Sequence, residues 1–121
     1  MTLVREVMTA GPIGLPEDAT LTDAAREMRS KNVGALFTFS DTGVRGMVTD
    51  RDIVVRGLAE GADPDTTPVQ DVASESLVTV QASSSTDEAA RLMQEQGVRR
   101  LPVVDGDEVV GLVSLEDLAA R

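Results

Sequence analysis

The chain of 121 residues contains no cysteine and no histidine, and its only aromatic residues are Phe37 and Phe39. Without cysteine there is no disulfide framework, and without both residue types the usual zinc ligands and the commonest general base are missing. Nucleophilic catalysis by a Ser–His or Cys–His pair is excluded for the same reason. Two aromatic rings are too few for a platform that stacks single-stranded bases. We therefore expect neither a metal site nor an enzyme.

Long apolar runs are also absent. No stretch approaches the roughly 20 residues that span a bilayer, and the N-terminus lacks the apolar core of a signal peptide. The chain carries 11 basic and 21 acidic residues, a formal net charge of −10. This field repels polyanions and argues against DNA or RNA as a partner. The expected protein is cytoplasmic, with no membrane or nucleic-acid partner, and its ligands would be small molecules.

An internal repeat is the main feature that the sequence does contain. Shifted by 65 residues, Val4–Arg56 aligns with Val69–Arg121 without a gap, and 13 of the 53 aligned positions are identical. A duplicated unit predicts a pseudo-twofold body with two equivalent clefts. The expected boundaries are a first repeat with its lead-in at 1–60, a polar linker at 61–68 and a second repeat at 69–121. Because each repeat is close to the lower size limit for independent folding, we expect the two to share one core.

Each repeat is predicted to form a strand, a helix, two more strands and a second helix, after a short helical lead-in. Capping boxes at Thr20 and Ser85 begin the first helix of each copy, and Asn32 and Gly97 end it. The two following strands of each copy pair as a β-hairpin. Pro102 lies inside one of these strands, which predicts an edge or strand-start position.

A Gly-hydrophobic-Val-Thr/Ser-x-x-Asp motif closes each hairpin, at Gly46–Asp52 and Gly111–Asp117. Together with the repeat, Val7–Thr9, Val33–Leu36 and Val98–Asp105, it resembles the CBS domain, two of which form a Bateman module. The resemblance covers nearly the whole chain and extends to the small stand-alone bacterial CBS-pair proteins, including the mycobacterial hypoxic-response type. It implies a mixed α/β (α+β) fold of two β-α-β-β-α repeats, with no part left for a catalytic or channel domain. The implied role is regulatory or ligand-sensing.

The same resemblance implies adenosine ligands in clefts between the two repeats. The motif Asp would accept hydrogen bonds from the ribose hydroxyls, the Thr or Ser would contact ribose or phosphate, and apolar strand residues would hold adenine. It assigns the first cleft to Met47, Thr49, Asp52, Leu77, Val78, Val98, Arg99 and Arg100. A second, weaker cleft is assigned to Pro12, Ile13, Val33, Gly34, Ala35, Leu112, Ser114 and Asp117.

The two clefts differ in charge. Arg99 and Arg100 offer the first cleft guanidinium groups suited to phosphate, and Arg51 lies close by. Gly34 and Ala35 occupy the matching place in the second cleft without any charge. We therefore expect AMP, ADP or ATP as a regulatory ligand in the first cleft, with AMP favoured because the net negative charge disfavours ATP. The second cleft is expected to be weak, empty or limited to an uncharged nucleoside.

Alternatives remain open from the sequence. Thr49–Asp52 and Ser114–Asp117 have capping-box spacing, so these residues could serve helix stability alone, in a structural or protein-interaction module without a ligand. Each Arg of the first cleft could instead form a surface ion pair. A homodimer is expected through the Ala-Ala-Met helix faces, unless each monomer consumes them internally. An effector protein of unknown identity is a further expected partner.

Overall fold

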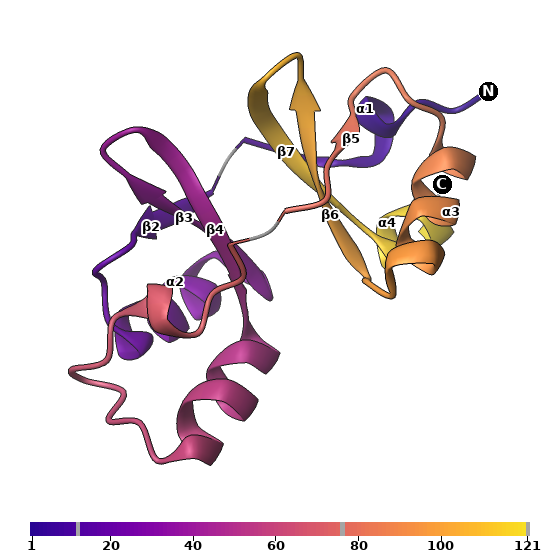
Figure 1. Cartoon of the computed structure of the whole chain (residues 1–121). Coiled ribbons are helices and arrows are strands. Elements are labelled where there is room, and N and C mark those ends of the chain that lie inside the picture. Colours follow the sequence, from indigo (N-terminus) through magenta and orange to yellow (C-terminus); the bar gives the residue numbers. More distant parts are fainter. Residues whose placement is uncertain (12, 76, 121) are drawn as a thin grey trace. The chain divides into compact units, whose positions relative to one another are not determined.

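The structure is a computed structural model that describes residues 1–11, 13–75 and 77–120 (Figure 1). Its contacts divide the chain into two compact units, each with its own sheet and helices. Unit 1 comprises Met1–Pro12 and Leu77–Arg121, and unit 2 comprises Ile13–Ser76. The predicted mixed α/β fold of two repeats is confirmed. No helix in the described part of the chain is both long enough and apolar enough to cross a membrane.

Unit 2 contains a three-stranded sheet in the order β2-β3-β4, in which β3 pairs parallel with β2 and antiparallel with β4. Its elements are β2 (Gly14–Pro16), α2 (Leu21–Lys31), β3 (Ala35–Ser40), β4 (Gly43–Thr49), the π-helix η1 (Asp52–Gly57) and the 3-10 helices η2 (Leu58–Glu60) and η3 (Val69–Asp71). The predicted strand-helix-strand-strand-helix order is therefore present in this unit.

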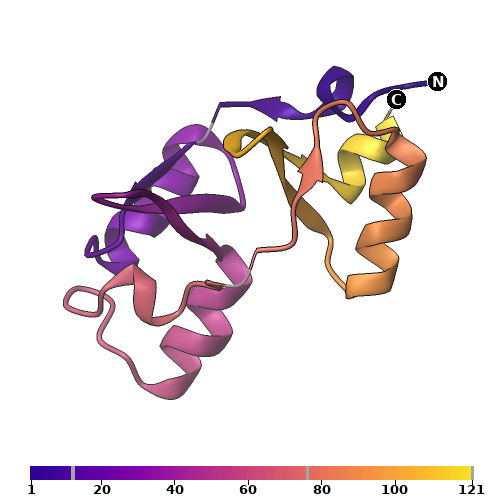
Figure 2. The same ribbon diagram turned by 45° about the horizontal axis from the view of Figure 1, so that its top comes forward.

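Unit 1 repeats the order with a four-stranded sheet, β1-β7-β6-β5. Its elements are α1 (Val4–Val7), β1 (Thr9–Ala10), β5 (Val80–Gln81), α3 (Thr86–Gln96), β6 (Arg100–Asp105), β7 (Glu108–Ser114) and α4 (Leu115–Ala120). Within this unit, α3 and α4 lie side by side on one face of the β6-β7 hairpin (Figures 1 and 2).

The helix boundaries follow the predicted local signals, except that the full capping box is recorded at Thr20 while Ser85 caps through its hydroxyl alone. The Thr20 hydroxyl accepts a hydrogen bond from the Asp23 N–H at 3.1 Å, and the Ser85 hydroxyl accepts one from the Glu88 N–H at 3.1 Å. At the other ends, Asn32 and Gly97 adopt the left-handed conformation, with φ of 55° and 65°. Both helices therefore begin and end where side-chain capping and a permissive C-terminal residue allow.

The lead-in of each repeat joins the hairpin of the other repeat. In unit 1, β1 pairs with β7 through Thr9 and Leu112, and in unit 2 Ser74 forms the corresponding bridge with Met47. Both crossings occur beside a glycine, Gly46 or Gly111. A Cβ at Gly46 would clash with the Ser74 carbonyl, and one at Gly111 would clash with the Thr9 carbonyl. The motif glycine thus lets the lead-in backbone approach closely.

This exchange of lead-ins means that the compact units cut across the predicted repeat boundaries. Val4 from the first lead-in is fully buried in the core of unit 1, and Val69 from the second is fully buried in the core of unit 2. The buried residues form a separate cluster in each unit, and the expectation of one shared core stays a prediction. Each small core is completed by apolar residues that the other repeat supplies.

The predicted linker at 61–68 packs against the start of α2. The Leu21 N–H donates to the Thr67 carbonyl at 3.2 Å, and the Thr22 N–H donates to the Pro64 carbonyl at 3.0 Å. The Thr22 hydroxyl also donates to Asp65 Oδ1 at 2.6 Å. The segment therefore satisfies N–H groups of the first helical turn that have no partner within the helix.

Pro102 occupies an inner strand, so its predicted edge or strand-start position is wrong. It is the third residue of β6, paired with Leu112 of β7 on one side. In unit 2 the equivalent Phe37 N–H donates to the Ile13 carbonyl. Pro102 has no N–H to donate, and on this side the ladder with β5 begins only at Val103. The proline therefore interrupts no recorded ladder hydrogen bond at this position.

Candidate functional site

The two hairpins end in the same reciprocal pair of hydrogen bonds. In unit 2, the Thr49 N–H donates to Asp52 Oδ2 at 2.9 Å and the Asp52 N–H donates to Thr49 Oγ1 at 3.1 Å. In unit 1, the Ser114 N–H donates to Asp117 Oδ2 at 2.8 Å and the Asp117 N–H donates to Ser114 Oγ at 3.1 Å. Both motifs are therefore capping boxes, as their spacing predicted.

The second carboxylate oxygen of Asp52 takes no part in the cap and forms a long ion pair with Arg56. Asp52 Oδ1 lies 4.0 Å from Arg56 Nη1, and the Asp52 side chain is 22% exposed. One oxygen can therefore hold the helix start while the other accepts a hydrogen bond from a ligand. A carboxylate that caps a helix with one oxygen and keeps the other as an acceptor suits a ligand with hydroxyl groups.

The surroundings of Thr49 within unit 2 carry no charge on the strand side. Ala35 pairs with Thr49 across the hairpin, and the Asp50 N–H donates to the Gly34 carbonyl at 3.0 Å. The Phe37 N–H donates to the Ile13 carbonyl at 3.0 Å. Unit 2 thus contains the following predicted residues of both clefts: Ile13, Val33, Gly34, Ala35, Met47, Thr49 and Asp52.

Unit 1 places the arginines beside the second motif. Arg100 pairs with Ser114 across the hairpin, and the Leu115 N–H donates to the Arg99 carbonyl at 2.8 Å. Val78 packs against the core of the unit, and Val98 is 39% exposed. The predicted residues in this unit are Leu77, Val78, Val98, Arg99, Arg100, Leu112, Ser114 and Asp117.

Each predicted cleft therefore draws residues from both units. The first combines Asp52 of unit 2 with Arg99 and Arg100 of unit 1, and this combination stays a prediction. Pro12, assigned to the second cleft, lies outside the described residues.

Arg99 forms an ion pair within its own unit. Its Nη2 lies 3.2 Å from Glu116 Oε1, and the two side chains are 68% and 67% exposed. The backbone N–H of Glu116 itself, and then the Arg99 side chain, hold the pKa of Glu116 below its ordinary value. Arg99 thus forms a surface ion pair in this structure, and its role toward a ligand stays a prediction. Arg100 is half-buried, and no carboxylate lies within ion-pair distance of it among the residues that the structure describes.

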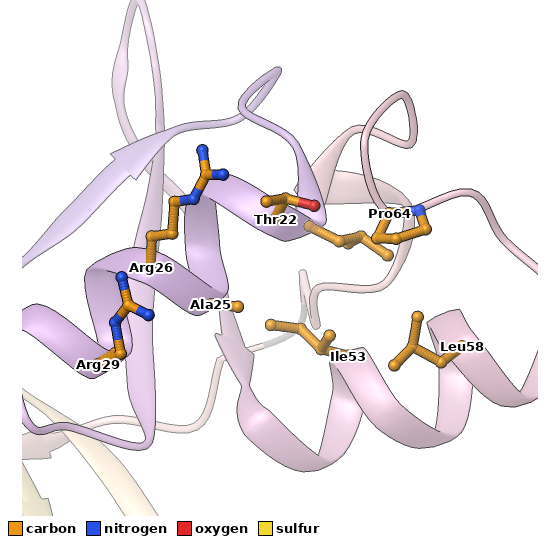
Figure 3. Close-up of a pocket in the computed structure, with 8 residues that line it drawn as sticks. Thr22, Ala25, Arg26, Arg29, Ile53, Leu58 and Pro64 are labelled. Carbon is orange, nitrogen blue, oxygen red and sulfur yellow. The ribbon is translucent and has the colours of Figure 1, made fainter.

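Sequence reasoning missed an apolar groove in unit 2. The groove has a volume of about 340 Å³ and lies between α2 and the helical segment η1–η2. Ala25 of α2 faces Ile53 and Leu58 across it, while Arg26 and Arg29 extend along the outer side of α2 (Figure 3). Nearby, Val54, Val55 and Leu58 are 56%, 43% and 49% exposed. The run Ile53-Val54-Val55 was the available signal, because a short helix cannot bury three consecutive apolar residues on one face.

The helix faces that the sequence assigned to dimer contacts are largely used inside each unit. Ala24 and Met28 of α2 are buried in the core of unit 2, and Ala89 and Met93 of α3 are buried in the core of unit 1. Only Ala25 of the first Ala-Ala pair is exposed. A contact between copies through α2 would therefore use Ala25 together with residues outside the Ala-Ala-Met face.

Two β-α-β-β-α repeats, each ending its hairpin in a Thr/Ser-x-x-Asp capping box, define a duplicated α/β module. The family model described as the CBS domain matches residues 4–58 and 69–121. The chain therefore belongs to the CBS-domain family and contains two copies of the domain.

Relatives support the same assignment. The chain is 42% identical over 120 residues to Hypoxic response protein 1 of Mycobacterium tuberculosis, covering 98% of this chain and 84% of that protein. The crystal structure of Hypoxic Response Protein I with two coordinated zinc ions matches with a TM-score of 0.85 and 40% identity, over 99% of this chain and 98% of that one. The CBS domain pair of protein MJ0100, in complex with 5′-methylthioadenosine and S-adenosyl-L-methionine, matches with a TM-score of 0.87 and 24% identity, over 99% and 94%.

The chain lacks histidine and cysteine, two of the usual zinc ligands. Within the ranges 1–11, 13–75 and 77–120, no group of three or more acidic side chains could hold a metal ion.

Proposed function

We propose that this chain is a regulatory CBS-pair module that binds an adenosine nucleotide, with AMP the favoured ligand. Thr49 and Asp52 would hold the ribose, and Arg99 with Arg100 would hold the phosphate. The observation that carries the proposal is that the cap uses only Oδ2 of the partly exposed Asp52, so Oδ1 is left as a ribose acceptor while the cap stays intact. The adenosyl ligands of the MJ0100 pair are consistent with this chemistry.

The ribose assignment follows from the chemistry of a diol. Two neighbouring hydroxyls donate well to a carboxylate, and hydrogen bonds to an ionised acceptor are stronger than neutral ones. Asp117 carries the same cap in unit 1, so both motifs offer ribose chemistry. They would differ at the phosphate, because Gly34 and Ala35 stand where the other repeat has Arg99 and Arg100. We expect one phosphate-dependent site and a second site that is weak, empty or limited to a nucleoside.

Calorimetric titration with adenosine, AMP, ADP, ATP and S-adenosyl-L-methionine tests the proposal. We expect one saturable site for AMP and a higher melting temperature in its presence, since a ligand bound only by the native state stabilises it. Two equal phosphate-dependent sites would contradict the asymmetry. No binding and no thermal shift with any of the five compounds would contradict the proposed function.

A second candidate is a structural or protein-interaction module that binds no nucleotide. It is favoured by the fact that both motif carboxylates already cap helices. Asp52→Asn separates the two candidates, because an amide keeps an oxygen to accept the Thr49 N–H but loses the negative charge. Nucleotide binding predicts a large loss of affinity with little change in melting temperature. For an interaction module, pull-downs with and without AMP would recover the same partners.

We also propose that the chain forms a homodimer through the exposed apolar surface of unit 2 made by Ala25, Val54, Val55 and Leu58. Burying such a surface against a second copy is favourable at about 25 cal/mol per Å². Light scattering on Val54→Asp should show a shift toward monomer. Ala119→Asp is the matched control, because Ala119 is exposed on α4 at the position that the repeat equates with Val54. A variant V54D that stays dimeric would contradict this contact.

A further inference from the structure

Two positions related by the repeat carry charges that differ between the copies. Gly34 corresponds to Arg99, and Arg51 corresponds to Glu116, each 65 residues further along the chain. In unit 2, Arg51 is exposed and forms no ion pair within the described residues, and Gly34 offers it no side chain. In unit 1 the same two positions hold an arginine and a glutamate, 3.2 Å apart.

Glu116 can hold the Arg99 guanidinium in an ion pair at neutral pH. It lies in the first turn of α4, two residues after the capping Ser114, and its pKa is held below the ordinary value. The carboxylate is therefore ionised at neutral pH, where a nucleotide phosphate is ionised as well. A phosphate that approaches the Arg99 guanidinium must compete with a carboxylate already bound to it.

We propose that Glu116 is a specificity-determining residue that competes with nucleotide phosphate for Arg99. The inference rests on the proposed function, because it concerns the phosphate end of that same ligand. Glu116 lowers the affinity for phosphorylated nucleosides and leaves the affinity for the unphosphorylated nucleoside unchanged. It thereby determines how much of the binding energy comes from the phosphate and how much from ribose and adenine.

The ion pair between Glu116 and Arg99 is weak enough for a phosphate to displace it. Both side chains are about two-thirds exposed, and exposed pairs are weak, so a phosphate can displace the carboxylate. Removing the charge of Glu116 should therefore tighten AMP binding by about two- to five-fold, a size typical of exposed ion pairs. A glutamate that serves only the helix dipole would change the melting temperature and leave the ratio of AMP to adenosine affinity as it was.

The test compares four proteins in calorimetric titrations with adenosine and AMP at one ionic strength. They are the wild type, Glu116→Gln, the control Glu95→Gln and the double variant Arg99→Gln/Glu116→Gln. Glu95 is an exposed residue of unit 1 whose ion pair is with Arg91, at 3.5 Å. Its replacement makes the same change in net charge without freeing Arg99.

We expect E116Q to bind AMP about two- to five-fold more tightly and adenosine as the wild type does. E95Q should match the wild type for both ligands, and the double variant should lose the gain. An equal gain for adenosine, an equal gain in E95Q, or no gain in E116Q would overturn the inference while the proposed function stands. A wild-type protein that binds neither ligand overturns the proposed function and this inference with it.

Discussion

The hairpins of unit 2 and unit 1 both end in a capping box, and both receive a lead-in strand beside a glycine. Both bury the same leucine position, since Leu36 and Leu101 are each 1% exposed. Outside these positions the two units differ in charge. Unit 2 carries a polar network in which Arg45 contacts Glu17 at 2.8 Å and Glu75 at 2.7 Å. Duplication has thus kept the glycine, the capping box and the buried leucine of each hairpin, while the charges around them differ between the copies.

The polar network reaches into the core of unit 2. Fully buried Thr38 donates to Gln70 Oε1 at 2.6 Å, and Gln70 Nε2 lies 3.4 Å from Glu75 Oε1. In unit 1 the repeat places the fully buried Val103 where unit 2 has Thr38, and Val110 where it has Arg45. The same backbone therefore accepts a hydrogen-bonded layer in one copy and an apolar layer in the other.

The largest expected effect tests whether the two cores are equivalent. Leu36→Ala and Leu101→Ala should each lower the free energy of unfolding by about 2–5 kcal/mol, because each leaves a cavity in a small core. Chemical denaturation measures the loss, and hydrogen exchange identifies the unit that opens. Leu115→Ala, at a 38% exposed position, is the control and should cost far less. A strong loss from only one of the two variants would show that the cores are not equivalent.

The exchanged lead-ins are tested at the two crossing glycines. Gly46→Ala and Gly111→Ala should each destabilise by about 1–3 kcal/mol, since the added methyl group meets a backbone carbonyl that cannot move independently. Thermal denaturation of both variants gives the cost. If either substitution were neutral, the lead-in could not lie as close to that hairpin as the structure places it.

Substitutions of the two capping carboxylates can distinguish effects on stability from effects on nucleotide binding. Asp52→Ala and Asp117→Ala should each cost about 0.5–2 kcal/mol of stability, because each removes the acceptor of a capping box. Only Asp52→Ala should also abolish the phosphate-dependent AMP site. Parallel denaturation and calorimetry distinguish the two effects. Equal loss of AMP affinity in both variants would remove the functional difference between the units.

The smallest expected effect is a pH dependence from the Arg45 network of unit 2. The hydrogen bond from Arg45, and then its charge, hold the pKa of Glu75 below the ordinary value of 4.5. A depressed folded pKa means that the contribution is present above pH 4.5 and is lost as the pH falls through the folded value. Arg45→Ala should therefore lower stability slightly at neutral pH and lose this deficit on acidification. A deficit that persists in acid would assign it to packing of the Arg45 side chain.

Several features of the fold could be predicted because they depend on neighbours in the sequence. The boxes at Thr20, Thr49 and Ser114 each join residues three apart, and the turn at Asn32 depends on its own backbone. Pro102 shows the limit of such reasoning. Its missing N–H is visible in the sequence, but the length of the neighbouring strand is not.

The two motif carboxylates of the candidate site could also be predicted from the sequence. The repeat singled out Asp52 and Asp117, and the structure gives both the predicted cap. The partner of Arg99 could not be chosen from the sequence, because phosphate and carboxylate suit a guanidinium equally well. The groove beside Ile53 and Leu58 was also missed, since it requires α2 and η1 to be placed against each other.

By itself, the sequence determined the duplication, the order of elements in each copy and the position of each helix cap, because these depend on interactions over a few residues. Only the tertiary structure decided that each lead-in completes the other repeat's core, that the apolar residues form two clusters, and that Arg99 pairs with Glu116. Those outcomes depend on residues far apart in the chain. Their proximity arises only when backbone pairing and burial bring distant segments together.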